Sequence, residues 1–317
     1  MLGVFLDRDT TDRGDIDLSR LEDILFIWRY YNLTRPNELH ERIADASVII
    51  SNKVVLDEAA FSAAPKLKLV CVAATGTNNV DMKAAERHGV VVCNVRAYAT
   101  HSVTQHAFSM ILALSNSLGI YRRAVLRGEW QQSPQFCMLD YPIHEIAGKK
   151  MGIIGYGELG KAMEKLAEAF GMEVLICQRL HGEPVPGRVD LNELLPQVDV
   201  LTLHCPLSPQ TENLIGEAEL ALMKSSSLLI NTARGGIVDE TALVKALRDH
   251  QIGGAGVDVL TTEPPIAGNP LLDDYDLNLI ITPHIAWASQ ESRQRLINQV
   301  ADNISAFINN APINQVN

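Results

Sequence analysis

Short apolar runs rich in Val, Ile and Leu alternate along the whole chain with segments that have helical spacing. In the first hundred residues, four such runs predict strands: LGVFL, ASVIIS, LKLVCVA and VVVCNV. The segments between them, such as NELHERIADA and DMKAAERHG, predict helices. Continuous apolar strands separated by helices are typical of a parallel sheet that is covered on both faces, so we expect an α/β fold.

A second series of strands starts at KKMGIIGYG and runs through MEVLICQ, VDVLTLHCP, SLLINTARGG, GGAGVDVL and LNLIITPH. Between the two series, residues 100–148 begin with one long predicted helix, SVTQHAFSMILALSNSLGIY, and continue as an irregular arm. A last helix, predicted over 289–309, is expected to pack back on the first domain. The pattern predicts two doubly wound parallel-sheet domains with a cleft between them. Residues 1–99 completed by 288–317 form one domain, and residues 100–287 form the other.

Charge and cysteine content narrow the class of protein. The 317 residues carry 27 Lys and Arg against 38 Asp and Glu, a net charge of −11, with no basic run. This argues against a nucleic-acid or anionic-membrane partner. The five cysteines include no C-x-x-C pair, which favours a reducing cytoplasm and argues against a disulfide framework or a zinc site. Charged residues directly follow the first apolar run, unlike in a signal peptide. No apolar run is long enough to span a membrane.

A G-x-G-x-x-G pattern at Gly155, Gly157 and Gly160 directly follows the apolar strand 151–154 and opens a helix that closes at Gly171. In that context Gly155 permits a tight turn, Gly157 lets backbone N–H groups approach a pyrophosphate, and Gly160 lets helix and strand pack closely. The helix N-terminus adds partial positive charge. The stretch predicts a dinucleotide site. The other residues of this loop are included in the predicted site: Tyr156, Glu158 and Leu159.

The end of the next strand normally carries an acid that hydrogen-bonds the adenosine ribose. This chain has Gln178 there, followed by Arg179, with His181 and Arg188 nearby. A carboxylate repels a 2′-phosphate, whereas a neutral amide beside a guanidinium admits one, so NADP(H) is slightly favoured over NAD(H). Two alternatives remain open. Arg179 is a solvated surface residue and Gln178 still binds NAD(H), or Glu183 is a displaced ribose acid.

Three polar side chains follow three later strands. Arg234 comes after the strand in LLINTARGG, Glu263 lies in a proline-stiffened loop after GAGVDVL, and His284 follows LIITP. In an open parallel sheet, the loops at the carboxyl ends of the strands share one crevice where ligands bind. We therefore expect these three side chains to converge beside the nicotinamide. Asp239 is placed to cap the helix after Arg234.

The motifs GIIGYGELG, LHCPLSPQT, LINTARGGIVDE, GAGVDVLTTEPP and TPHIAWAS resemble those of the D-isomer-specific 2-hydroxyacid dehydrogenases, over nearly the entire chain. Within that family the chain is most similar to the bacterial glycerate dehydrogenase (hydroxypyruvate reductase) group. The resemblance implies a flavodoxin-like substrate domain and a Rossmann dinucleotide-binding domain. It also implies hydride transfer between NAD(P)H and a small 2-oxo acid, such as hydroxypyruvate or glyoxylate, giving D-glycerate or glycolate.

The resemblance assigns roles to the three polar side chains. Arg234 holds the substrate carboxylate and polarises the carbonyl, because a planar guanidinium matches a carboxylate. His284 donates a proton to the carbonyl oxygen and acts as a base in the reverse direction. Glu263 accepts a hydrogen bond from the other ring nitrogen and orients the ring. Backbone N–H groups around Ala74, Thr75 and Gly76 resemble the family's second carboxylate-binding element.

The remaining implied residues concern the cofactor. Asp258 is expected to receive the nicotinamide carboxamide, or alternatively to cap its strand end. The segment His204–Cys205–Pro206–Leu207 is expected to line the nicotinamide ribose. Further cofactor contacts are expected at Thr211, Thr232 and Ala233. Cys205 is interpreted as a packing residue and not as a nucleophile. No metal is assigned, because His101 and His106 lie five apart, roughly 140° around a helix.

Other expectations remain open at this stage. The family commonly has an acid near the start of the long helix, where this chain has Gln105 and His106. The arm within 100–148 resembles the family's dimer contact, which predicts a homodimer. Two alternatives to the proposed activity are a dinucleotide-sensing interaction protein of the corepressor type, and a dehydrogenase for another D-2-hydroxy acid.

Overall fold

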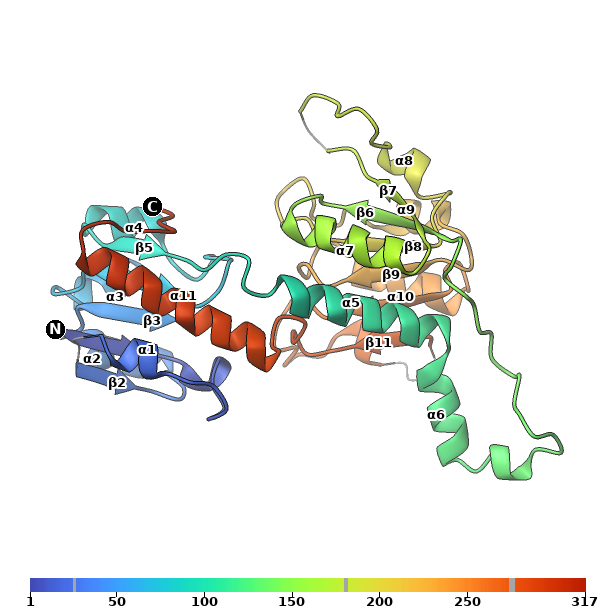
Figure 1. Cartoon of the computed structure of the whole chain (residues 1–317), viewed down its shortest axis with the longest axis horizontal. Coiled ribbons are helices and arrows are strands. Elements are labelled where there is room, and N and C mark those ends of the chain that lie inside the picture. Colours follow the sequence, from blue (N-terminus) through green and yellow to red (C-terminus); the bar gives the residue numbers. More distant parts are fainter. Residues whose placement is uncertain (25–26, 180–181, 274–276) are drawn as a thin grey trace. The chain divides into compact units, whose positions relative to one another are not determined.

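The computed structural model of the chain describes residues 1–24, 27–179, 182–273 and 277–317. The chain divides into two compact units. Unit 1 contains residues 1–99 and 288–317, and unit 2 contains residues 100–287 (Figure 1). Each unit is built around one parallel sheet. The predicted fold class, two parallel-sheet α/β domains, is confirmed.

The sheet of unit 1 has five parallel strands in the order β2-β1-β3-β4-β5, which is the flavodoxin-like order. Its strands are β1 (Leu2–Phe5), β2 (Ile27–Tyr30), β3 (Val48–Ser51), β4 (Leu69–Val72) and β5 (Val91–Cys93). All residues of β3 and β4 are buried, as expected for central strands covered on both faces.

Helices cover both faces of this sheet. They are α1 (Ser19–Glu22), α2 (Pro36–Ile43), α3 (Glu58–Ala63), α4 (Met82–Arg87) and α11 (Gln290–Ile308). Helices α2, α3 and α4 share a core with the strands, whereas α11 packs against β4 and α1 (Figure 1). One side of α11, including Leu296, Val300 and Ile304, is fully buried. The segment after α11 also joins the sheet, because Val316 N donates to Val92 O. Unit 1 is therefore assembled from both ends of the chain.

The sheet of unit 2 has six parallel strands in the order β11-β10-β9-β8-β6-β7. They are β6 (Lys150–Ile154), β7 (Glu173–Ile176), β8 (Val200–Leu203), β9 (Leu228–Asn231), β10 (Gly254–Val257) and β11 (Leu279–Ile281). Beside β7, a single parallel bridge joins Cys177 to Val189. With that bridge counted as a reduced third strand, the sheet has the order 3-2-1-4-5-6 of the dinucleotide-binding fold, and β11 adds a seventh strand beside the sixth.

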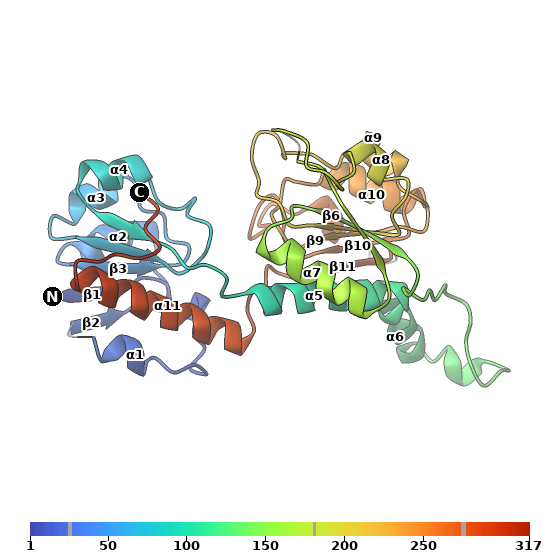
Figure 2. The same ribbon diagram turned by 45° about the horizontal axis from the view of Figure 1, so that its top comes forward.

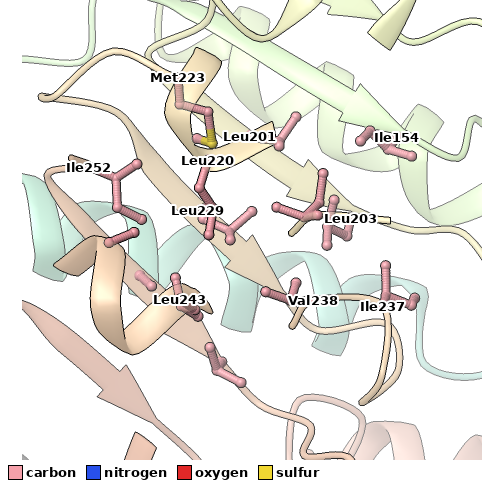
Figure 3. Close-up of a cluster of buried hydrophobic side chains, with 14 of the residues drawn as sticks. Ile154, Leu201, Leu203, Leu220, Met223, Leu229, Ile237, Val238, Leu243 and Ile252 are labelled. Atoms are coloured by element: carbon pink, nitrogen blue, oxygen red, sulfur yellow. The ribbon is translucent and has the colours of Figure 1, made fainter. Parts of the chain in front are cut away.

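The helices of unit 2 form two separate cores with this sheet. They are α5 (Thr100–Ser115), α6 (Leu118–Leu126), α7 (Glu158–Ala169), α8 (Leu191–Leu194), α9 (Glu217–Leu222) and α10 (Glu240–Arg248). Alternate residues of β9 show the division. Leu229 packs with α8, α9 and α10 (Figure 3), whereas Leu228 and Ile230 pack with α5 and α7. Figure 2 shows α5 and α7 on one face of the sheet. None of the helices in the described ranges is long and apolar enough to cross a membrane.

Two elements differ from the sequence prediction. Strand β2 was not predicted. It is an edge strand whose residues alternate between exposed and half-buried, unlike the fully buried central strands. The long helix predicted over 102–121 is also wrong in its extent. It is two helices, α5 and α6, separated at Ser117, whose φ of +50° breaks the helical path.

Candidate active site

Arg234, Glu263 and His284 follow three neighbouring strands of unit 2. Arg234 comes after β9, Glu263 lies in the loop after β10, and His284 follows β11. These strands are parallel and adjacent in the sheet, so their carboxyl ends lie along one edge. The three side chains therefore start from the same end of one sheet.

His284 and Glu263 are in direct contact. His284 Nδ1 lies 2.5 Å from Glu263 Oε2, and Glu263 Oε1 accepts a hydrogen bond of 2.8 Å from Leu260 N. Both side chains are partly exposed, at 26% for His284 and 33% for Glu263. In the described chain, nothing hydrogen-bonds the other ring nitrogen, Nε2. The pair therefore presents an oriented imidazole with one nitrogen held and one available.

The backbone of His284 is held in an uncommon conformation. Its φ of +55° is in the left-handed region, which residues other than glycine rarely adopt. Hydrogen bonds to buried Asp258 stabilise this backbone conformation. The carboxylate accepts hydrogen bonds from Ile285 N (2.9 Å) and Ala286 N (2.8 Å), while Asp258 O accepts from His284 N (2.8 Å). Both carboxylate oxygens thus fix the loop, which supports the strand-end alternative for Asp258, and contact with a cofactor stays a prediction.

Helix α5 fastens the same loop. The Thr282 hydroxyl donates to Asp258 Oδ1, and His106 Nε2 lies 2.9 Å from Thr282 Oγ1. Ser102 Oγ, also on α5, donates to Ala286 O at 2.7 Å. His106 and Thr282 were missed by the sequence reasoning as positioning residues. The only local signal was a polar residue at the end of the apolar run LII.

Hydrogen bonds with a neighbouring side chain hold the backbone of Arg234 in the loop after β9. Asn231 Oδ1 accepts from Ala233 N (3.0 Å), and Asn231 Nδ2 donates to Arg234 O (2.9 Å). A Cβ added to Gly235 would lie 2.0 Å from Leu260 O, so this loop is pressed against the one that carries Glu263. The side chain of Arg234 is exposed, and no carboxylate in the described ranges pairs with it. Its Nη1 donates to Ala233 O at 2.7 Å, and because none of the described carboxylates pairs with it the guanidinium can also bind an anion. Asn231 and Gly235 were also missed.

The glycine loop has the shape that a dinucleotide requires. Gly155 has a φ of +90°, and a Cβ there would lie 2.5 Å from Cys205 N, while a Cβ at Gly160 would lie 2.3 Å from Gly155 O. Beside Gly157, in contrast, an added Cβ meets nothing within 4 Å. Gly157 is the N-cap of α7, and no side chain caps the helix there. The open space and the uncapped N–H groups fit a pyrophosphate.

Two buried polar atoms lie at the ends of neighbouring strands. Leu203 of β8 pairs with Asn231 of β9, so the next residues, His204 and Thr232, follow side by side. His204 Nδ1 and Thr232 Oγ1 are buried and have no hydrogen-bond partner among the residues that the structure describes. Burial lowers the pKa of His204 to about 4, so its ring is neutral at neutral pH. Because buried polar atoms are normally paired, these two fit the polar groups of a bound nicotinamide nucleotide.

Hydrogen bonds to a threonine hydroxyl hold the loop after β8 in its conformation. Thr211 Oγ1 donates to Pro206 O and accepts from Ser208 N, both at 2.7 Å. Contact of Thr211 with a cofactor stays a prediction. Burial raises the pKa of the Cys205 thiol, which keeps it protonated and agrees with a packing role.

Gln178 follows β7, and its amide is already engaged. Its Oε1 accepts from Val185 N (3.1 Å) and Arg179 N (3.1 Å), while Nε2 donates to Val185 O (3.4 Å). Arg179 and Glu183 are exposed, and His181 lies outside the described residues. The residue at the strand end is therefore an amide that is already hydrogen-bonded, and a ribose contact by Glu183 stays an open alternative.

The loop predicted to hold a second carboxylate contact lies in unit 1. Thr75 Oγ1 donates to Val95 O (2.9 Å), and Asn94 Nδ2 donates to Thr75 O (2.8 Å). The backbone N–H groups of Ala74, Thr75 and Gly76 have no acceptor among the described residues. Three successive free N–H groups suit an anion.

No three or more His, Cys, Asp or Glu side chains in the described ranges are arranged to hold a metal ion.

The chain is similar to known proteins along nearly its whole length. The family described as "D-isomer specific 2-hydroxyacid dehydrogenase, NAD binding domain" matches residues 108–286. The chain is 47% identical to glycerate dehydrogenase of Methylorubrum extorquens over 99% of this chain and 98% of that one. It is 39% identical to hydroxypyruvate reductase of Blautia hydrogenotrophica over 99% of both chains. The TT0316 protein of Thermus thermophilus superimposes with a TM-score of 0.89 at 32% identity, over 100% of both chains.

These matches give no support to the corepressor alternative. They agree with the glycine loop and the buried polar atoms in indicating a nicotinamide dinucleotide cofactor. This chain therefore belongs to the D-isomer specific 2-hydroxyacid dehydrogenase family.

Proposed function

We propose that this enzyme reduces hydroxypyruvate or glyoxylate to D-glycerate or glycolate with NAD(P)H. The observation that carries the proposal is the contact of 2.5 Å between His284 and Glu263, in loops packed beside that of Arg234. The names of the relatives, a glycerate dehydrogenase and a hydroxypyruvate reductase, support the substrate class.

His284 serves as the general acid. Glu263 occupies Nδ1, so Nε2 is the nitrogen that donates a proton to the carbonyl oxygen and takes it back in the reverse reaction. The carboxylate also fixes the ring orientation. When bound, the nicotinamide supplies the hydride that turns the 2-oxo group into a 2-hydroxy group.

Arg234 binds the substrate carboxylate and polarises the carbonyl. Its exposed guanidinium has the planar fork that matches a carboxylate, and Asn231 fixes the backbone from which it extends. The free N–H groups of Ala74, Thr75 and Gly76, in unit 1, stay a predicted anion contact.

For the cofactor we infer a preference for NADP(H) over NAD(H). The strand end that carries an acid in NAD-binding relatives of this fold has the neutral Gln178 here, followed by the cation Arg179. Neither side chain repels a 2′-phosphate.

The direct test is a comparison of kcat/KM for NADH and NADPH with hydroxypyruvate, glyoxylate, pyruvate and 3-phosphohydroxypyruvate. We expect the highest values with the first two acids and with NADPH. Tight cofactor binding without turnover of any of these acids would contradict the proposal and favour a binding protein. Selective turnover of pyruvate would instead indicate another D-2-hydroxy acid as the product.

Two alanine substitutions in the glycine loop are expected to separate cofactor binding from folding. Gly157→Ala places a methyl group in open space, so we expect an unchanged melting temperature and cofactor affinity weakened by at least tenfold. Gly160→Ala forces a Cβ to 2.3 Å from Gly155 O, so we expect a lowered melting temperature. Calorimetric titration and thermal unfolding check both. Full cofactor affinity in the Gly157 variant would show that the pyrophosphate lies elsewhere.

We further propose that the protein is a cytoplasmic homodimer. All five cysteines are free, as expected in a reducing compartment. The arm after α6 (Figure 1) exposes large apolar side chains, including Phe136 at 90% and Leu139 at 78%. Apolar side chains gathered on one segment mark an interaction surface.

The double substitution Phe136→Ser and Leu139→Ser is expected to convert the dimer into a monomer, because it removes apolar surface that a second copy would bury. Sedimentation equilibrium measures the mass. Ile27→Ser is the matched control, since Ile27 is 74% exposed but lies on an edge strand of unit 1. A monomeric parent protein would rule out the dimer.

A further inference from the structure

The end of β7 carries a group of cations that no acid in the described chain neutralises. Arg179 follows Gln178, and Arg188 precedes Val189, which bridges to Cys177 at the end of β7. Lys161 lies in the first turns of α7, directly after the glycine loop. No carboxylate pairs with any of the three in the ranges that the structure describes, although Glu164 lies three residues from Lys161 on the same helix.

Tyr156 connects these cations to the glycine loop. The guanidinium carbon of Arg188 lies 5.5 Å from the centre of the Tyr156 ring, and Lys161 Nζ lies 5.9 Å from it. The Tyr156 hydroxyl donates to Glu164, so the ring cannot turn freely. Cation–π contacts of this kind hold a cation in place while leaving its N–H groups free to donate elsewhere.

The position of Arg188 is fixed from a second direction. Arg188 directly precedes Val189, whose bridge to Cys177 holds this part of the loop beside the end of β7. It therefore lies between the strand end and the glycine loop. In a dinucleotide-binding fold this is where the adenosine ribose binds.

The loop that carries Arg188 is also preorganised. The side-chain amide of Gln178 is hydrogen-bonded to the backbone of Val185 through both its oxygen and its nitrogen. The backbone N–H of Gln178 donates to Val189 O at 2.7 Å. Gln178 thus stands where an acid would bind the ribose, and its amide holds the loop instead. Through Val185 and Val189, Gln178 holds the backbone on both sides of Arg188.

We propose that Arg188 and Lys161, held against Tyr156, bind the 2′-phosphate of NADP(H). This inference rests on the proposed function and assigns the selection of the phosphate to these two side chains, with Arg179 on the exposed side as a lesser contact. A phosphate bound by two cations gains charge-assisted hydrogen bonds that a bare ribose hydroxyl does not offer.

The test measures binding of two fragments by titration calorimetry, adenosine 2′,5′-bisphosphate and AMP, which differ only in the 2′-phosphate. For Arg188→Ala we expect affinity for the bisphosphate to fall by about ten- to a hundredfold, the range of a charge-assisted contact, with AMP affinity changed less than twofold. Arg188→Lys should recover part of the loss. Lys161→Ala should weaken the bisphosphate alone, whereas Lys165→Ala, an exposed lysine one turn later on α7, should not.

Three results would overturn the proposal. They are bisphosphate affinity at the parent level in Arg188→Ala, an equal loss for both fragments, and a loss that follows Arg179→Ala alone. Failure of the proposed function looks different, because it would appear as no turnover of any 2-oxo acid by the parent enzyme with either cofactor, whatever the fragments bind.

Discussion

Replacing His284 with alanine is expected to lower kcat for hydroxypyruvate reduction by about two to four orders of magnitude, the usual worth of a general acid. The loss should fall on kcat and less on KM, because in this proposal the carboxylate is bound by Arg234, which the substitution leaves in place. The melting temperature should stay close to that of the parent, since the ring is partly exposed and the loop is held through backbone groups.

Glu263→Gln is the matched variant for this prediction. Its amide oxygen can still accept from His284 Nδ1 but carries no charge, so we expect a smaller loss of kcat than in His284→Ala. Steady-state kinetics under saturating cofactor measures both variants. Parent-level turnover by His284→Ala would exclude the imidazole as the proton donor.

The second large effect is expected at Arg234. Arg234→Ala should lower kcat/KM by about two to four orders of magnitude. In the proposed mechanism the guanidinium both binds the substrate carboxylate and stabilises negative charge on the carbonyl oxygen. Structural damage should be small, since the only hydrogen bond from this side chain in the described ranges is to the adjacent Ala233 O.

Arg234→Lys keeps the charge but loses the planar fork, so it should recover part of the binding and less of the rate. A substrate series without a carboxylate, such as the matching 2-oxo alcohols, provides the control. If Arg234→Ala impaired those substrates as strongly as the acids, the side chain would not be the carboxylate receptor.

The parts of this molecule that could be predicted are those that a short stretch of sequence determines. Each of the apolar runs before Arg234 and His284 is itself a strand, and parallel strands bring their carboxyl ends to one edge. The glycine loop was predictable for the same reason, because Gly155, Gly157 and Gly160 act within one turn.

What escaped prediction depends on distant partners. The positioning role of His106 needs Thr282, which lies 176 residues away in the chain. Gly235 is required only because Leu260 packs against it. Gln178 shows the limit most clearly. Its identity indicated the lack of a ribose acid, but only the fold revealed that its amide is used to hold Val185. The dimer stays a prediction.

The assembly of unit 1 from both termini has a consequence for biosynthesis. On the ribosome, residues 1–99 emerge first but lack α11, whose buried side packs against β4. Unit 2 is continuous in sequence and can complete its fold once residue 287 has left the exit tunnel. We therefore expect unit 2 to fold before unit 1 is complete. Until α11 is translated, the sheet of unit 1 stays partly uncovered and accessible to chaperones.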